Sequence, residues 1–458
     1  MAMELKNLSR TSVPLENSPE EIQLENRVET DGTRSPISVQ ANDAVQDSSD
    51  TASLGMIAPN TKSQIMKKRI HFAVFCWGHL MSGWHDGSAG PLLPRIQEVY
   101  QIKFVVASLI FVCACVGFVS GAMANVYLSE RMKFGKILLL GGLFPLISFV
   151  IQAPALPFPA FVLSYVLTGA GIALQHAQAN AYVATLDRDP SARLSIFHAA
   201  YGLGAFSAPL AATQFAQMRR WSFHFLVSLG IASVNVVLIA LVFRLRSKDE
   251  CRAEIGLEPS EKGTSDRSVF RQIFALKSVH TMAAFIFMYV GTEVTIGGWI
   301  VTYIIQLRGG GADSGYISSG FFGGLMLGRL ALLPLNKLLG LRRVVILYAV
   351  LSISLELTIW FVPSLIGNGV AVSIIGVLFG PLYPIAVSVA GTVIPKWLFT
   401  GSIGWIAGFG QAGGAALPFI TGAMADGVGI SSLQPLLVAM MCVMAGTWII
   451  VPKSKKAD

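Results

Sequence analysis

An acidic side chain stands within an apolar stretch near the start of the chain. Asp86 lies in the segment GWHDGSAGPLLP, residues 83–94, which directly follows the apolar run HFAVFCWGHLMS. An ionised carboxylate surrounded by hydrocarbon is costly, so such residues usually face a polar cavity or a partner. Asp86 is therefore predicted to bind and release a proton, and its protonation would control the opening of a pathway. The alternative is an acid that is capped by a nearby donor such as His85 or Arg95.

A second acid, Glu293, has aromatic neighbours at helical spacing. Tyr289 precedes it by one helical turn, and Trp299 and Tyr303 follow it in the same apolar segment. Ring faces can stack on an amphipathic solute such as a sugar, while a carboxylate accepts hydrogen bonds from its hydroxyl groups. We predict that Tyr289, Glu293 and Trp299 bind a solute and that Glu293 also binds a proton. Alternatively, the aromatic residues only pack between helices and Glu293 is neutral or paired.

Four polar residues interrupt a third apolar segment, namely Gln175, His176, Gln178 and Asn180. Positions 175 and 178 are three apart and positions 176 and 180 are four apart, so at least two of these side chains share a helix face. Histidine titrates near neutral pH. All four are predicted to bind solute, and His176 also to bind a proton. The alternative is a hydrogen bond between helices that only holds the bundle together.

Gln411 and Arg329 also have predicted roles, whereas a metal site is not predicted. Gln411 is a candidate solute contact, and Arg329, which follows Gly328 near the inner end of its segment, is predicted to hold an inner gate closed. No metal-ligand geometry emerges from the histidines in three of the apolar segments, His79, His85, His176 and His198. Neither a metal nor a cofactor is therefore predicted.

The segments that must position these residues are membrane-spanning helices. The chain has 458 residues, of which 53% are hydrophobic and only 13% charged, against about 25% charged in soluble domains. Apolar runs recur at the length that crosses a hydrocarbon core of about 30 Å. We predict an all-α membrane protein with twelve transmembrane helices, at 70–93, 105–127, 137–154, 158–184, 195–217, 222–244, 279–306, 314–336, 344–363, 367–391, 400–423 and 430–451.

The charges predict how the chain is oriented. Basic residues concentrate in the loops that share a side with the N-terminus, which places both termini in the cytosol. The net charge of +8 therefore reflects topology and not nucleic-acid binding. Residues before the first helix contain no aromatic residue and are rich in Ser, Glu and Asp, which is typical of disorder. The predicted parts are a disordered cytosolic tail (1–69), a six-helix half (70–244), a cytosolic central loop (245–278), a second six-helix half (279–452) and a cytosolic tail (453–458).

The two predicted halves resemble each other. The offset that separates Asp86 from Glu293 also carries Gly117-x-x-x-Gly121 onto Gly324-x-x-x-Gly328. An acid that matches an acid, together with matching glycine pairs in corresponding spans, favours an internal repeat. Parallel six-helix repeats with the solute site between them, near the middle of the membrane, are one plan of secondary transporters.

At this level the chain resembles the major facilitator superfamily over residues 70–452. The segment GAMANVYLSERMKFGK, residues 121–136, is similar to the cytosolic loop signature of that superfamily, without its usual aspartate and double basic pair. The corresponding loop of the second half keeps Gly328-Arg329 and Gly340-Leu341-Arg342-Arg343. The resemblance implies two pseudo-symmetric six-helix halves that rock around a central solute site.

Within that superfamily the chain resembles the fucose:proton symporter group and its eukaryotic sugar-transporter-like relatives. Trp77-Gly78, Asp86 and Leu92-Leu93-Pro94 are similar to the first span of that group, and Ala179-Asn180 to its fourth. In the group, an aspartate in span one and a glutamate in span four serve proton coupling and substrate binding. Asp86 matches the first of these residues, whereas His176 stands at the position of the second.

We therefore expect a secondary active transporter that moves a small organic solute by alternating access with proton coupling, a sugar being one candidate. Export of a metabolite or toxic compound is the alternative, and a non-transporting membrane sensor is a minor one. No catalytic constellation is apparent, so an enzyme is not predicted. The expected partners are a small-molecule substrate, protons and the lipid bilayer, with no nucleic acid, and the protein is expected to be a monomer. The plasma membrane or an internal membrane such as the vacuole would be its location.

Overall fold

The computed structural model describes residues 61–186, 190–258 and 267–452, and every regular element in these ranges is helical. The first part contains α1 (Lys62–Tyr100), α2 (Phe104–Ala107), α3 (Leu109–Arg131), α4 (Phe134–Gln152), α5 (Phe158–Val183), α6 (Pro190–Ala216), α7 (His224–Phe243) and α8 (Lys248–Glu254). The second part contains α9 (Arg267–Ala275), α10 (Lys277–Leu307), α11 (Tyr316–Ala331), α12 (Leu333–Leu339), α13 (Leu341–Phe361), α14 (Leu365–Phe379), α15 (Leu382–Val393), α16 (Lys396–Val428) and α17 (Leu433–Ile450). Residues 1–60 and 453–458 of the predicted tails lie outside the described residues, as do residues 259–266 of the predicted central loop.

Ten helical segments of the described chain are long and apolar enough to cross a membrane. An eleventh span results if residues 312–331 and 333–339, which meet at a bend of 55°, are counted together. The remaining predicted span, the first at residues 70–93, lies within α1, which has 39 residues and is therefore long enough to cross. Helix α1 is less apolar than the others because it carries polar side chains such as His79 and Asp86 among its apolar ones.

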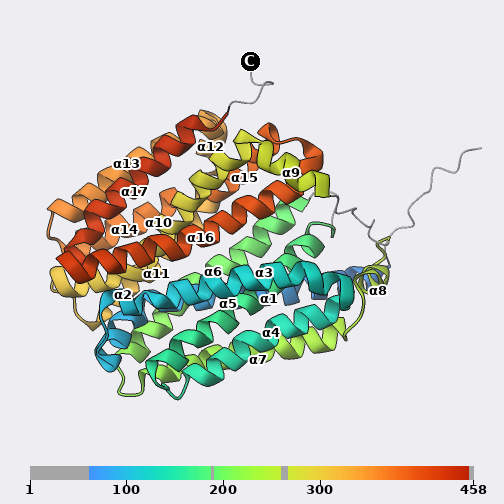
Figure 1. Ribbon diagram of the computed structural model, residues 1–458, viewed down its shortest axis with the longest axis horizontal. Helices are drawn as coiled ribbons and strands as arrows, with labels where there is room; N and C mark the ends of the chain where they lie inside the picture. Colours follow the sequence, from blue (N-terminus) through green and yellow to red (C-terminus); the bar gives the residue numbers. More distant parts are fainter. Residues whose placement is uncertain (1–60, 187–189, 259–266, 453–458) are drawn as a thin grey trace, which may run out of the picture. The chain divides into compact units, whose positions relative to one another are not determined.

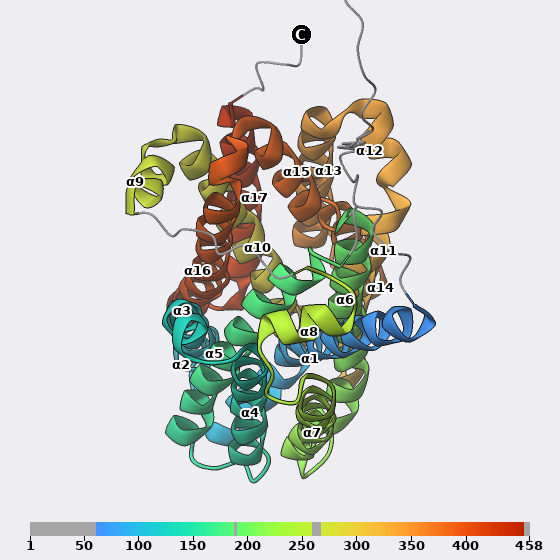
Figure 2. The ribbon, with the colours of Figure 1, turned by 90° about the vertical axis from the view of Figure 1, so that its right-hand side faces the viewer.

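The helices within residues 61–452 form one bundle, and we call the parts α1–α8 and α9–α17 its first and second halves. In Figures 1 and 2, α4 and α7 lie at the bottom and α13 lies at the top. Contacts between the halves are made by α1 with α10 and α11, by α6 with α11, and by α16 with α2 and α3. We call the two ends of the bundle the α2 end and the α8 end, after the short helices found there (Figure 1).

Glycines at helix crossings repeat between the halves. On α3, Gly117 packs against α5 so closely that a Cβ would lie 2.0 Å from the Val166 carbonyl oxygen. On α11, Gly328 packs against α14 in the same way, with 2.0 Å from a Cβ to the Val377 carbonyl oxygen. Small residues let helix backbones approach closely in a membrane. The glycines that the internal repeat pairs thus lie at close crossings in both halves.

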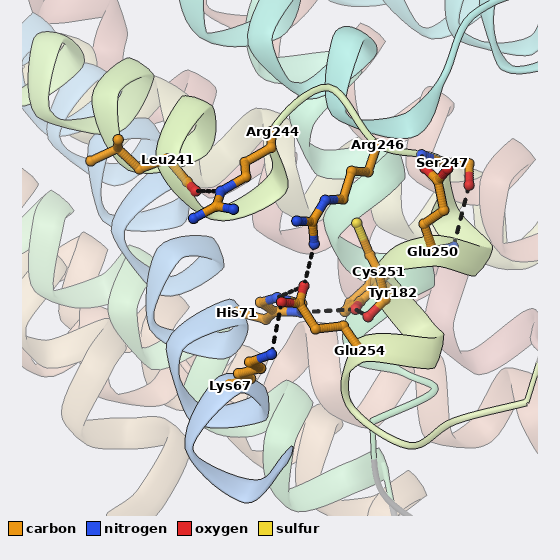
Figure 3. A network of polar contacts seen from close by, with 10 residues as sticks. All are labelled: Lys67, His71, Tyr182, Leu241, Arg244, Arg246, Ser247, Glu250, Cys251 and Glu254. Carbon is orange, nitrogen blue, oxygen red and sulfur yellow. Dashed lines mark hydrogen bonds and ion pairs between the residues drawn. The ribbon is translucent and has the colours of Figure 1, made fainter. Parts of the chain in front are cut away.

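Helix α8 is fastened to the first half by one acidic side chain, as Figure 3 shows. Oε1 of Glu254 lies 3.1 Å from Nζ of Lys67 on α1. Nη1 of Arg246, which follows α7, donates to Oε2 of Glu254 at 2.8 Å. The Tyr182 hydroxyl of α5 also donates to the backbone carbonyl of Cys251 on α8, at 3.2 Å. The start of the central loop is therefore held against α1, α5 and the end of α7.

Replacing Glu254 with glutamine is expected to destabilise the protein by about 1 kcal/mol at pH 7, the upper range for partly exposed ion pairs. Burial alone would raise the pKa of Glu254, but the hydrogen bond from Lys67 and the charge of Arg246 hold this pKa below its ordinary value. The stabilisation is therefore present above pH 4.5, the ordinary value, and is lost as the pH falls through the lowered pKa. Thermal unfolding of the purified protein across this pH range measures the effect.

Glu258→Gln is the matched control, because Glu258 is an exposed acid in the same loop. It is expected to unfold like the wild type at every pH. A Glu254→Gln variant as stable as the wild type at pH 7, or equally destabilised above and below the lowered pKa, would contradict an ionic role for Glu254.

Candidate functional site

Asp86 lies where α1 crosses α6, and it accepts a hydrogen bond from that helix. The Tyr201 hydroxyl of α6 donates to Oδ2 of Asp86 at 2.7 Å. Gly83 and Gly87, on either side of Asp86, touch the α6 backbone, and a Cβ at Gly83 would lie 2.0 Å from the Tyr201 carbonyl oxygen. This close approach positions the acid and the phenol. Asp86 is exposed to solvent although both glycines are buried, so its carboxylate is accessible to a proton or a solute.

Glu293 of α10 approaches the same region from the second half. Its carboxyl interacts electrostatically with Asp86, with the Tyr201 hydroxyl and with the Arg329 guanidinium of α11. Tyr289 lies one helical turn before Glu293 and also interacts with it. The Tyr289 hydroxyl is buried and has no partner at normal hydrogen-bond geometry. Two acids, one from each half, therefore share a polar region with one arginine.

Three histidines from three helices form a hydrogen-bonded chain on the α8 side of Asp86. Nδ1 of His79 on α1 lies 3.1 Å from Nε2 of His176 on α5, and Nε2 of His79 lies 3.2 Å from Nδ1 of His198 on α6. The Ser82 hydroxyl lies 2.9 Å from the same nitrogen of His176. His79 is only 4% exposed, whereas His176 and His198 are half-buried.

Arg329 connects the two halves at this histidine chain. Its Nη1 donates to the backbone carbonyl of His198 at 3.2 Å. The guanidinium also interacts electrostatically with His79 and His198, and its Nε is buried without a hydrogen-bond partner. The residue predicted to act in a gate therefore lies where α11 meets α6, near Glu293 and the histidines.

The other polar residues of α5 have partners of their own. Gln178 donates to Asn125 and Ser129 of α3, at 2.7 and 2.9 Å. Gln175 accepts from Asn235 of α7 at 3.2 Å and is buried. Asn180 donates to the backbone carbonyl of His176 at 2.9 Å. Of the four, only His176 joins the set that includes Arg329; Gln175 and Gln178 link α5 to other helices of the first half, and Asn180 bonds within α5.

Two predicted solute contacts of the second half lie in different surroundings. Trp299 is 0% exposed, and its Nε1 donates to the Pro418 carbonyl of α16 at 3.0 Å. Its ring lies near Phe104 and Phe111, so the indole is packed where the halves meet. Gln411, also on α16, is half-buried. The structure thus places Trp299 in packing and leaves Gln411 partly accessible.

Sequence reasoning missed Tyr201 and the connection between the histidines. His198, Tyr201 and Gly204 follow one another at a spacing of three residues, which places them along one face of a helix. Gly204 marks that face as a close crossing, since a Cβ there would lie 2.0 Å from the Leu80 carbonyl oxygen. This spacing was the available signal. It does not reveal that α1 is the helix on the other side.

The α2 end is closed by contacts between the halves. Asp426 of α16 accepts hydrogen bonds from the backbone N–H groups of Phe104, at 2.7 Å, and Val105, at 3.3 Å. Gly90 of α1 meets α10 so closely that a Cβ would lie 2.1 Å from the Gly297 carbonyl oxygen. A cavity of about 900 Å³ beside these contacts is lined by residues of both halves.

Comparison with known proteins places the chain among transporters. The model of the Major Facilitator Superfamily matches residues 75–333, more than half of the chain. "Bypass of stop codon protein 6" of Saccharomyces cerevisiae is 26% identical over 481 aligned positions, which cover 98% of this chain and 93% of that protein. A glucose/galactose transporter of Brucella abortus is 22% identical, over 76% of this chain and 86% of its own. The fucose:proton symporter of E. coli superposes with a TM-score of 0.60 at 16% identity, covering 86% of this chain and 100% of that structure, and this likeness concerns the fold.

Proposed function

The chain belongs to the Major Facilitator Superfamily and is a transporter and not an enzyme, and from this premise we propose that it carries a hexose-like sugar across a membrane together with protons. The observation that carries the proposal is the polar region in which Asp86 and Glu293, one acid from each half, interact with each other and with Tyr201, while Arg329 interacts with Glu293. Support for a sugar comes from the Brucella abortus relative, which is named for glucose and galactose.

A sugar fits this region because it offers many hydroxyl groups. Carboxylates accept hydrogen bonds from hydroxyls, and such bonds to charged groups are stronger than neutral ones. We propose that Glu293 and Asp86 accept from the sugar, and that Tyr289 and Gln411 add contacts from α10 and α16. The Tyr289 hydroxyl is buried and interacts with Glu293, so it would contact the same part of the sugar. His176 is proposed to contact solute from α5.

Proton coupling follows from the proximity of the two acids. Two carboxylates repel each other when both are ionised, and protonation of either removes that repulsion. Because Asp86 is exposed and held by one hydrogen bond from Tyr201, we propose that it takes up the transported proton. A sugar bound at Glu293 and a proton bound at Asp86 would then influence each other reciprocally.

Alternating access is proposed from the contacts between the halves. With both termini in the cytosol, as the basic loops predict, the α8 end is cytosolic and the α2 end faces the opposite side. The contacts of Asp426 with α2 and of Gly90 with α10 close the α2 end. Arg329 on the carbonyl of His198 joins the halves nearer the α8 end, and its release would accompany rocking of the halves.

Exchange of labelled hexoses tests the proposed transport. Proteoliposomes loaded with unlabelled D-glucose or D-galactose are expected to take up the labelled sugar by counterflow, with no imposed gradient. Vesicles without the protein, and labelled alanine as a solute without a hexose ring, are the controls. If folded and inserted protein exchanges no hexose above these controls, the sugar assignment is wrong.

A further inference from the structure

We propose that His79, His176 and His198 form a proton relay on the α8 side of Asp86, with His79 as its obligatory middle member. The proposal rests on the proposed proton-coupled transport and adds a path by which a proton moves between α6 and α5 beside Asp86. Its basis is the unbroken chain of ring-nitrogen contacts, at 3.1 and 3.2 Å, that runs from α5 through α1 to α6.

The position of His79 allows it to pass a proton between His176 and His198. A neutral imidazole has one N–H donor and one nitrogen acceptor. Both nitrogens of His79 are used on histidine neighbours, so the chain has two states, one with every N–H pointing towards His176 and one with every N–H pointing towards His198. His79 is buried, whereas the two end histidines are half-buried. A buried middle with accessible ends is the arrangement that a relay requires.

Passage of one proton converts one state of the chain into the other. In the state that points towards His176, a proton arrives at Nε2 of His198, and the Nδ1 proton of that ring moves to Nε2 of His79. The Nδ1 proton of His79 then moves to Nε2 of His176, whose Nδ1 proton is released. One proton has entered at α6 and one has left at α5, and all three rings are again neutral. The chain now points towards His198 and can carry a proton in the reverse direction.

The relay lies close to Asp86 along α1. His79 precedes Asp86 by seven residues, about 10 Å on the same helix face. Tyr201 fills the interval, because its ring centroid is 5.5 Å from that of His79 and its hydroxyl donates to Asp86. A phenol can both donate and accept a hydrogen bond. Tyr201 therefore lies between the relay and the proposed proton-binding acid.

Charged and polar groups of the surrounding helices also face the relay. Helix α11 contributes Arg329, which interacts electrostatically with His79 and His198. Helix α10 contributes Glu293, which interacts with Arg329 and Asp86. Towards α7 the facing group is the uncharged Asn235, near His79 and His176. Because Arg329 belongs to the other half, its charge near the relay would change when the halves move, which makes proton passage depend on conformation.

The geometry suits a relay better than a metal site. A metal ion needs ring nitrogens that converge on one point at bonding distance. His79 directs its two nitrogens to different neighbours, so the three rings do not converge. Within the described part of the chain, no group of three or more histidine, cysteine or acidic side chains is arranged to hold a metal.

Replacing His79 with glutamine or asparagine separates proton passage from packing. The amide nitrogen of glutamine replaces Nε2 and that of asparagine replaces Nδ1, so each variant keeps one contact. Neither side chain can accept a proton at one ring nitrogen and release another proton from a second nitrogen. Hexose counterflow, which needs no net proton movement, is expected to stay within about twofold of the wild type. Hexose accumulation under an imposed pH gradient is expected to fall at least about tenfold, as for loss of a proton-transfer group. His85→Gln, on the same helix but outside the chain, is expected to behave like the wild type.

Accumulation and counterflow that fall together in both variants would show that His79 only supports packing, which overturns the relay. Accumulation at the wild-type level in both variants overturns it too.

If the wild type shows no hexose counterflow, the sugar assignment is refuted, and the relay is then tested in an experiment without solute. Fluorophores at the exposed Val99 and Leu307, attached in a background without native cysteines, report movement between α1 and α10 after a pH jump. The relay predicts that His79→Gln slows this response at least about tenfold, and an unchanged rate in the variant overturns it.

Discussion

An Asp86→Asn variant is expected to lose proton-driven accumulation of hexose completely while it still exchanges hexose between equal concentrations. Asparagine has nearly the shape of aspartate, and its Oδ1 can still accept the hydrogen bond from Tyr201. It cannot bind a proton, however, so the proton gradient no longer acts on the transport cycle. The accumulation ratio should therefore fall to about one, whereas counterflow at saturating hexose should persist, with an affinity lowered by at most about 10- to 100-fold, the loss of one hydrogen bond to a charged group. Uptake by proteoliposomes with and without an imposed pH gradient measures both quantities.

Glu98→Gln is the matched control for this prediction. Glu98 is an acid on the same helix, but it lies at the α2 end, is exposed and pairs with Arg95. This variant is expected to accumulate hexose like the wild type. If Asp86→Asn accumulates hexose against its gradient, another group binds the transported proton and the assignment of Asp86 is wrong.

A Glu293→Gln variant is expected to bind hexose about 10- to 100-fold more weakly. Hydrogen bonds to a charged group contribute about 1.5–3 kcal/mol, and about 1.4 kcal/mol corresponds to a factor of ten in affinity. Glutamine retains one acceptor oxygen but loses the charge and offers donors where the sugar also donates. The concentration of hexose at half-maximal counterflow, together with direct binding to the purified protein, measures the change.

The second half contains a matched control for Glu293. Glu356 of α13 is 1% exposed, and its Oε1 has no hydrogen-bond partner, so Glu356→Gln removes a buried carboxylate outside the polar region. Its hexose affinity is expected to equal that of the wild type. Equal losses in the two variants would indicate that Glu293 acts on stability of the second half and not on the sugar.

The sequence predicted those features that depend on local pattern. Apolar runs of membrane-spanning length gave the helices, and polar residues inside them singled out Asp86, His176 and Glu293. The polarity that drew attention to α1 also explains why this helix is less apolar than its neighbours. Hydropathy alone therefore underrates the helix that carries the acid.

The partners of these residues could not be predicted, because they depend on contacts between distant segments. The Asp86–Tyr201 and His79–His176 pairs join residues more than ninety positions apart, and helical spacing shows which residues share a face but not what that face meets. Trp299 illustrates the same limit. Its aromatic ring fits both a solute contact and packing between helices, and only the structure shows that it lies against Phe104 and Phe111 of the other half.

Proton movement caused by the sugar itself tests the central claim most directly. Proteoliposomes in weakly buffered medium, with no initial pH or voltage difference, receive D-glucose or D-galactose on one side while a dye reports the external pH. Symport predicts that the medium becomes alkaline as sugar enters, and that Asp86→Asn abolishes this change although sugar still moves. Sugar entry by the wild type without any pH change would contradict proton coupling and would indicate a uniporter.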